Sequence, residues 1–168
     1  KNYHHKRIIK FLNNYKIDSI IDVGAHKGEF LDNCIPNILF KNAYAFEPQR
    51  DIFKILIKNF ERDSRVKNYN IALGAEKTNK IININKLTST SSLQELNHNS
   101  FFLKIKNFLI GKTNLKENSY EVEISTIDNF FQNKEILNIL LKIDVEGYEL
   151  NVLKGSNNTI KKTKLILI

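Results

Sequence analysis

Short runs of β-branched and other apolar residues alternate along the chain with segments whose apolar residues recur at helical spacing. The short runs have the length of buried strands, and the periodic segments have that of amphipathic helices. We expect strands at 19–23, 42–48, 66–74, 136–145 and 164–168, and helices at 3–16, 28–35, 51–63, 126–133 and 146–156. This alternation predicts an α/β fold, with right-handed βαβ units and helices on the faces of a mostly parallel sheet.

Two further segments alternate apolar and polar residues as half-buried strands do. These are 80–86 and 120–126, which we expect to form an antiparallel pair at the sheet edge. The stretch between them, 87–118, reads as a loop or lid insertion over the site. Neither an internal repeat nor an interdomain linker is visible, so we expect one domain over 1–168, with an N-terminal helix in 1–17.

The composition, 42% hydrophobic and 26% charged over 168 residues, is that of a soluble globular domain with a real core. No apolar run is long enough to span a membrane, and the start lacks a signal-peptide core. The single cysteine, Cys34, excludes an intrachain disulfide, and no zinc-ligand cluster is visible. We therefore expect a cytoplasmic protein without a structural metal.

The net charge of +8 raises nucleic acids or anionic surfaces as partners. The excess is almost all lysine, scattered among asparagine and isoleucine, while arginine is scarce. This pattern indicates a compositional bias more than a binding patch, so we do not expect a nucleic-acid partner. The oligomeric state stays open.

The first strand leads into the motif "DVGAHKG", with the spacing D-x-G-x-x-x-G over Asp22, Gly24 and Gly28. Ligands of open parallel sheets bind at the carboxyl ends of strands, where this motif lies. Gly24 permits a tight turn and close approach of a ligand, and Gly28 opens the next helix. The spacing differs from the G-x-G-x-x-G of dinucleotide-binding proteins, and glycine also serves ordinary turns.

Two more acidic strand ends follow along the chain. Glu47 ends the second strand, where a carboxylate can bind both hydroxyls of a ribose or stand as a solvated strand end. Asp144 and Glu146 follow the fourth parallel strand, where they could hold a cation, take a proton or contact a cationic cofactor. Capping of the next helix is the alternative for Glu146 and Glu149. We expect the carboxylates of Asp22, Glu47 and Asp144 to meet around one site.

In this order, "DVGAHKGEF", "AFEP" and "LKIDVEGYELNVLKG" resemble the FkbM-type family of S-adenosylmethionine-dependent methyltransferases. The resemblance covers about 18–168, and "KIDVEG" with the residues after it is its most specific part. It implies a Rossmann-like class I methyltransferase fold, a three-layer sandwich with a mostly parallel sheet. It also implies O-methylation of a hydroxyl on a sugar, glycan or polyketide-like acceptor. Because the sequence stops at its fifth parallel strand, we expect the fold to be truncated there.

Carried over residue by residue, the resemblance implies a binding site for S-adenosylmethionine. Glu47 would hold the ribose, and Ala72 and Leu73 would lie near the adenine. This cofactor has no pyrophosphate, so the loop tolerates His26, either as a surface residue or in contact with the cofactor. The full set of implied cofactor residues is Asp22, Gly24, Ala25, His26, Gly28, Glu47, Pro48, Ala72, Leu73 and Asp144.

For catalysis we hypothesise that Asp144, assisted by Glu146, accepts the proton of the acceptor hydroxyl or holds a cation. No metal ligand is assigned, and the need for a divalent cation stays open. One alternative is a NAD-dependent oxidoreductase, which the loop spacing disfavours and for which no hydride-transfer pair stands out. Another is a non-catalytic module that binds a cofactor or a nucleic acid.

Overall fold

The computed structural model describes residues 11–12, 14–84, 91–92 and 118–168. Its centre is a five-stranded sheet in the order β3-β2-β1-β8-β9, and every neighbouring pair is parallel. Each of these strands lies within a predicted strand or within one residue of it. Their bounds are β1 Ser19–Val23, β2 Asn42–Phe46, β3 Val66–Tyr69, β8 Ile139–Ile143 and β9 Thr163–Leu167.

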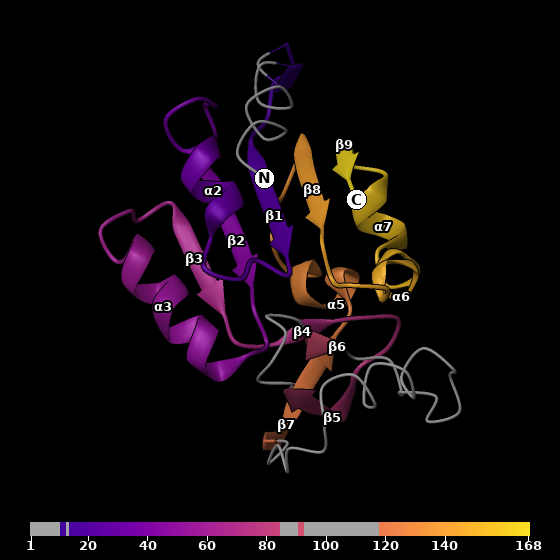
Figure 1. The fold of residues 1–168 in the computed structure, drawn as a ribbon. Helices are drawn as coiled ribbons and strands as arrows, with labels where there is room; N and C mark the ends of the chain where they lie inside the picture. The colour runs from indigo at the N-terminus through magenta and orange to yellow at the C-terminus, as the bar shows by residue number, and fades with distance from the viewer. Residues whose placement is uncertain (1–10, 13, 85–90, 93–117) are drawn as a thin grey trace, which may run out of the picture.

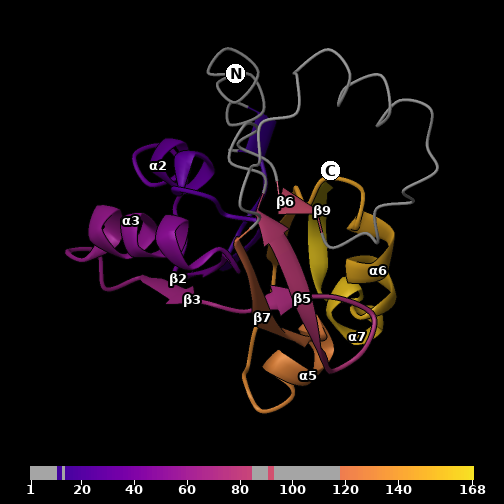
Figure 2. The ribbon, with the colours of Figure 1, turned by 60° about the horizontal axis from the view of Figure 1, so that its bottom comes forward.

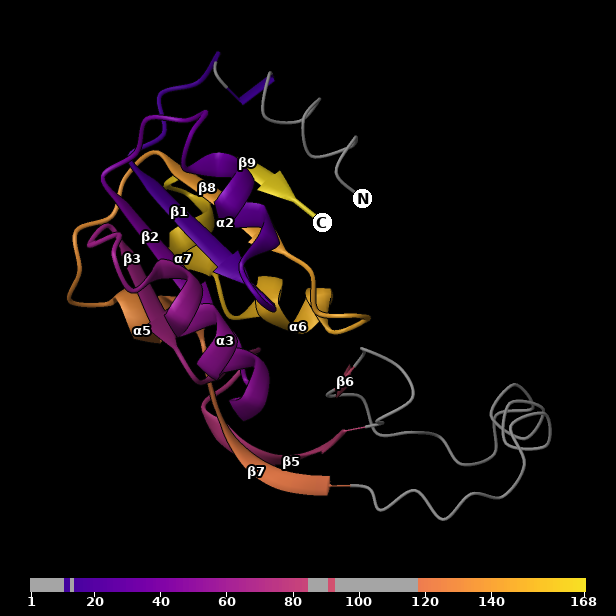
Figure 3. The same cartoon turned by 60° about the vertical axis from the view of Figure 1, so that its left-hand side comes forward.

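Helices cover both faces of this sheet, as Figures 2 and 3 show. Helices α2 and α3 supply apolar side chains to one buried cluster, and helices α5 and α6 supply them to a second. The three-layer α/β arrangement predicted from the strand and helix pattern is therefore confirmed. The helices are α2 Glu29–Cys34, α3 Arg50–Phe60, α5 Ile127–Phe131, α6 Glu149–Lys154 and α7 Asn157–Ile160.

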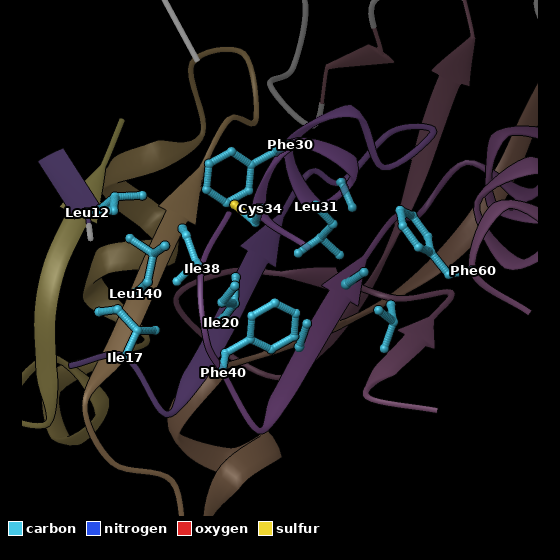
Figure 4. Close-up of a cluster of buried hydrophobic side chains, with 14 of the residues drawn as sticks. Leu12, Ile17, Ile20, Phe30, Leu31, Cys34, Ile38, Phe40, Phe60 and Leu140 are labelled. Atoms are coloured by element: carbon cyan, nitrogen blue, oxygen red, sulfur yellow. The ribbon is translucent and has the colours of Figure 1, made fainter. Parts of the chain in front are cut away.

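The two clusters share the strands between them, because successive side chains of a strand point to opposite faces. Ile20 of β1 packs with Phe30 and Leu31 of α2 (Figure 4), whereas Ile21 and Val23 belong to the opposite cluster. All five residues of β1 are buried, which explains its unbroken β-branched character. The same alternation assigns the next side chain after Ile21, the carboxylate of Asp22, to the face of α2.

A second sheet lies beyond the carboxyl ends of the parallel strands (Figure 1). The predicted antiparallel pair is confirmed as β5 with β7, but its predicted position at the edge of the parallel sheet is wrong. The pair joins a separate four-stranded sheet in the order β4-β7-β5-β6. Its strands are β4 Ala72–Leu73, β5 Thr78–Ile84, β6 Ser91–Ser92 and β7 Asn118–Ser125.

The single strand predicted over 66–74 is also wrong, because the chain changes sheets within it. It leaves the parallel sheet after Tyr69 and joins the second sheet at Ala72. Asn70 fixes this bend, since its side-chain amide donates to the carbonyl oxygens of Glu47 and Pro48, at 2.8 and 3.0 Å. The local pattern of apolar and polar residues does not carry that information.

The helix predicted over 146–156 is shorter than expected and ends, as predicted, at Gly155. A short helix, α7, follows it before the last strand. Of the helix predicted in 1–17, only 11–12 and 14–17 are described, and Phe11 and Leu12 are helical. Most of the 87–118 insertion lies outside the described residues. Among the helices that the structure describes, none is long and apolar enough to cross a membrane.

Candidate functional site

The carboxyl ends of β2, β1 and β8 lie side by side, because β1 pairs with both neighbours in parallel register. Asp22 lies opposite Ala45 on one side and Lys142 on the other. The backbone N–H of Asp144 continues this pattern by donating to the carbonyl of Val23, at 3.0 Å. The loops that carry the predicted site residues therefore leave the sheet at one edge.

The loop after β1 is tied to the end of β2. The N–H groups of Gly24 and Ala25 both donate to the carbonyl of Phe46, each at 3.0 Å. Gly24 has φ +74° and Gly28 has φ +91°, values that favour glycine. A Cβ on Gly24 would lie 2.1 Å from the carbonyl oxygen of Asp144, so the β1 and β8 loops are in direct backbone contact. Packing alone thus requires Gly24.

Glu47 is held at the end of β2 by this loop. Its Oε2 accepts a hydrogen bond from the backbone N–H of His26 at 2.9 Å, and Oε1 accepts one from Gln49 N–H at 2.8 Å. Burial raises the pKa of the Glu47 carboxyl, although these two bonds oppose the shift. The alternative of a solvated strand end is wrong, since Glu47 is only 3% exposed.

The His26 side chain lies at the surface and its backbone serves Glu47. The ring Nδ1 is 3.0 Å from Glu29 Oε1, and the side chain is 34% exposed. The residue has φ +53°, a left-handed conformation uncommon outside glycine. This conformation aims the His26 N–H at Glu47, so the histidine acts on the site through its main chain.

Asp22 is fully buried and paired with Lys142, a residue that was not among the predicted site residues. Its Oδ1 lies 3.0 Å from Nζ of Lys142, whose side chain is 13% exposed. No other described residue gives either carboxylate oxygen a hydrogen bond. Burial opposes the charge of Lys142, but the adjacent Asp22 carboxylate raises the pKa of the ammonium group. Burial raises the pKa of the Asp22 carboxyl, and the Lys142 ammonium group opposes that shift. Asp22 lies beneath the loop instead of on its surface.

The same ammonium group links Asp22 to the other parts of the site. Nζ of Lys142 donates to the carbonyl of Gly24 at 2.8 Å and lies 3.7 Å from Oδ2 of Asp144. A signal for it was present in the sequence: a lysine inside the apolar run "ILLKI" needs an acidic partner if the strand is buried. Asn70, which fixes the loop after Glu47, carries no comparable signal.

Asp144 and Glu146 differ in environment from Asp22. The side chain of Asp144 is 65% exposed, and Glu146 is exposed with φ +50°. Glu149 lies in the first turn of α6, and its Oε1 accepts the N–H of Gly147, which precedes the helix, at 2.9 Å. That hydrogen bond lowers the pKa of the Glu149 carboxyl. Glu146 holds a strained conformation of the kind that clusters at functional sites.

The remaining predicted residues are Pro48, which directly follows Glu47, and Ala72 and Leu73 of β4. Ala72 and Leu73 are buried at 3% and 1% exposure in β4, and their side chains pack in the core. Pro48 contributes its carbonyl to the Asn70 hydrogen bond. Within the described part of the chain, no group of three or more His, Cys, Asp or Glu side chains is placed to hold a metal ion.

Comparison with known proteins adds a family and a fold. The model of the methyltransferase FkbM domain matches residues 22–168. A crystal structure of methyltransferase FkbM from Methylobacillus flagellatus KT has a TM-score of 0.57 and 19% identity, over 89% of this chain and 32% of that one. The chain thus spans about a third of that protein's length. A search of curated proteins finds no match.

Two further structures overlay more loosely. TrmK of M. capricolum, in complex with S-adenosyl-homocysteine, has a TM-score of 0.48 and 17% identity, over 96% of this chain and 48% of that one. A S-adenosylmethionine-dependent methyltransferase from Clostridium acetobutylicum ATCC 824 has a TM-score of 0.42 and 14% identity, over 95% and 45%. Neither bears on function at that distance. The family match covers the glycine loop, the buried acid of β2 and the β8 motif together, and the chain belongs to the methyltransferase FkbM domain family.

Proposed function

We propose that this domain transfers a methyl group from S-adenosylmethionine to a hydroxyl of a sugar, glycan or polyketide-like acceptor. The observation that carries the proposal is the buried carboxylate of Glu47, oriented by two backbone N–H groups beside the β1 loop. Membership of the FkbM family supports the methyl transfer. We also expect a cytoplasmic location, on the sequence features alone.

The residues at the edge of the sheet fit such a cofactor. Each carboxylate oxygen of Glu47 accepts one described hydrogen bond and can accept another, so a pair of ribose hydroxyls suits it. The loop 24–28 would lie against the amino-acid end, with Asp144 on the side of the positive sulfur. When bound, the cofactor supplies a methyl group already activated by that sulfur. The chain has to orient the acceptor and exclude water.

Cofactor binding is tested by calorimetric titration of the wild-type domain with S-adenosylhomocysteine and with NAD. We expect the first to bind and the second not to. Glu47→Gln should weaken S-adenosylhomocysteine binding by about tenfold or more, since a buried charged hydrogen-bond acceptor is lost. Glu135→Gln, at an exposed position, is the matched control and should bind as the wild type does.

Each rival function has its own signature in the same titrations. Binding of NAD instead of S-adenosylhomocysteine would support an oxidoreductase. Binding of neither, together with salt-sensitive binding of DNA or RNA, would support a nucleic-acid module. Equal affinity of the wild type and Glu47→Gln for S-adenosylhomocysteine would remove the assigned role of Glu47.

Asp144 is the proposed proton acceptor, with Glu146 assisting, because its exposed carboxylate lies next to the loop. Asp144→Asn should lower methyl transfer by about 10²–10⁴-fold, the usual range for loss of a general base. Transfer of a radiolabelled methyl group to a panel of oligosaccharides measures this, with circular dichroism as the check on folding. Asp51→Asn, at an exposed position of α3, is the control. Unchanged turnover in Asp144→Asn would refute the assignment.

A further inference from the structure

Lys142 is the point where the β1 loop and the β8 strand are joined through side-chain chemistry. Its Nζ lies 3.0 Å from Asp22 Oδ1, 2.8 Å from the Gly24 carbonyl oxygen and 3.7 Å from Asp144 Oδ2. Parallel register puts Lys142 directly opposite Asp22, and the alternation of side chains puts both on the same face of the sheet. One mostly buried cation therefore faces three oxygen-bearing groups.

The contact with Gly24 completes a clamp on a single peptide group. The carbonyl of Gly24 and the N–H of Ala25 belong to the same peptide plane. Lys142 holds the oxygen of this peptide, and the carbonyl of Phe46 accepts its N–H at 3.0 Å. Gly24 is in the left-handed region, and glycine can leave this region for φ < 0 without a steric penalty of its own. Among the described residues, Lys142 alone gives the Gly24 carbonyl oxygen a hydrogen bond.

We propose that Lys142 is a positioning residue for the cofactor loop, an inference that rests on the proposed function. By clamping the Gly24–Ala25 peptide, it aims the next N–H, that of His26, at Oε2 of Glu47. The loop then holds its binding shape before a cofactor arrives, which lowers the ordering cost of binding. The carboxylates of Asp22 and Asp144, which lie 3.0 and 3.7 Å from Nζ, balance the charge of this ammonium group.

The test distinguishes two roles of Lys142: clamping the Gly24–Ala25 peptide, and only balancing the charge of Asp22. Asp22→Asn removes the buried carboxylate but leaves the Gly24 carbonyl and the Asp144 carboxylate in contact with the ammonium group. Asp22→Asn/Lys142→Met removes both, so no buried carboxylate is left without its cation. Lys154→Met, at an exposed position of α6, is the control for loss of a lysine. Two measurements are made on each protein: affinity for S-adenosylhomocysteine by calorimetry, and amide hydrogen exchange of the segment 24–28.

If Lys142 clamps this peptide, Asp22→Asn and Asp22→Asn/Lys142→Met should differ in loop exchange and in affinity. Asp22→Asn should keep slow exchange in 24–28, whereas the double variant should exchange there at least about tenfold faster, because local opening then costs less. Exchange in α3 should not change. Affinity for S-adenosylhomocysteine should fall by about tenfold or more from Asp22→Asn to the double variant.

Equal loop exchange and equal affinity in these two proteins would overturn the proposal and leave Lys142 as a counter-charge only. Loss of the whole fold in the double variant, with Asp22→Asn still folded, would also overturn it, since Lys142 would then support the domain and not the loop. If the wild type does not bind S-adenosylhomocysteine, the proposed function fails. The exchange comparison still decides the role of Lys142 in that case, because it needs no cofactor.

Discussion

Gly24 and Glu47 owe their properties to contacts with backbone atoms of other residues. Gly24 reads in the sequence as a place where a ligand approaches the backbone, but the carbonyl of Asp144 already occupies the space of its missing side chain. Glu47 reads as the end of a strand, but two backbone amides and deep burial set its ionisation. At this scale, the packing of two loops determines which atoms remain for a ligand.

We expect Gly24→Ala to destabilise the domain. A left-handed φ on alanine alone costs about 1–3 kcal/mol, and the overlap with a backbone oxygen adds to that cost. Gly74→Ala is the control, because its new Cβ would meet only side-chain atoms, the nearest at 3.0 and 3.1 Å. Urea unfolding of both variants measures the difference. Equal losses at the two positions would show that the β1 loop can move away from Asp144.

The raised pKa of Glu47 predicts a pH-dependent contribution to stability. Since the folded state holds this proton more tightly than the unfolded state, the contribution is greatest at low pH. It falls as pH rises from the ordinary value of 4.5 through the raised folded value. The free energy of unfolding of wild type minus that of Glu47→Gln should therefore decrease over this range. Urea titrations from about pH 4 to pH 8 measure it, and a difference that rises with pH would contradict it.

At the scale of elements, short helices depend on neighbours more than on their own sequences. The helix α7 has four residues, and its start is held by the α5 side chain of Asp128. The Asp128 carboxylate accepts hydrogen bonds from the N–H of Asn158 and from the N–H and hydroxyl of Thr159, each at 2.8 Å. This carboxylate fixes two helices together.

We expect Asp128→Ala to cost about 2–3 kcal/mol in the free energy of unfolding, because charged hydrogen bonds to partly buried groups are lost. Asp51→Ala provides the comparison. Its carboxylate forms an exposed ion pair with Lys54, an interaction that contributes under about 0.5 kcal/mol. Denaturant unfolding at neutral pH gives both values. A loss at Asp128 no larger than that at Asp51 would mean that α7 does not need its cap.

At the scale of the whole molecule, two sheets meet at the edge that carries the site. The chain crosses from one to the other between Tyr69 and Ala72, immediately after the bend that Asn70 fixes beside Glu47. The lysine excess is spread along the chain, whereas the ion pairs of Lys142 and the glycine loop lie at the carboxyl edge of the parallel sheet. The charge of the whole chain is therefore a separate property from the chemistry of the site.

This separation predicts little effect of salt on cofactor binding. S-adenosylhomocysteine carries no net charge at neutral pH, and Glu47 is shielded from solvent. A protein that binds nucleic acid through several phosphates loses about 10³–10⁵ in affinity between roughly 50 and 200 mM salt, whereas the dissociation constant here should change by less than about threefold. Calorimetry at the two salt concentrations checks this, and a steep dependence would indicate binding driven by the lysine excess.

The local sequence determined the identity of the elements and the position of the acids at strand ends. The five strands of the parallel sheet, the helices between them other than α7, and Glu47 and Asp144 at carboxyl ends follow from periodicity, which depends on near neighbours. Only the tertiary structure decided that β4 belongs to the second sheet. It alone also decided that Gly24 packs against Asp144 and that Lys142 joins Asp22 to the Gly24 carbonyl. These features depend on contacts between segments far apart in sequence, such as Asp22 with Lys142 and Ala72 with Ile124, whereas periodicity reports only on near neighbours.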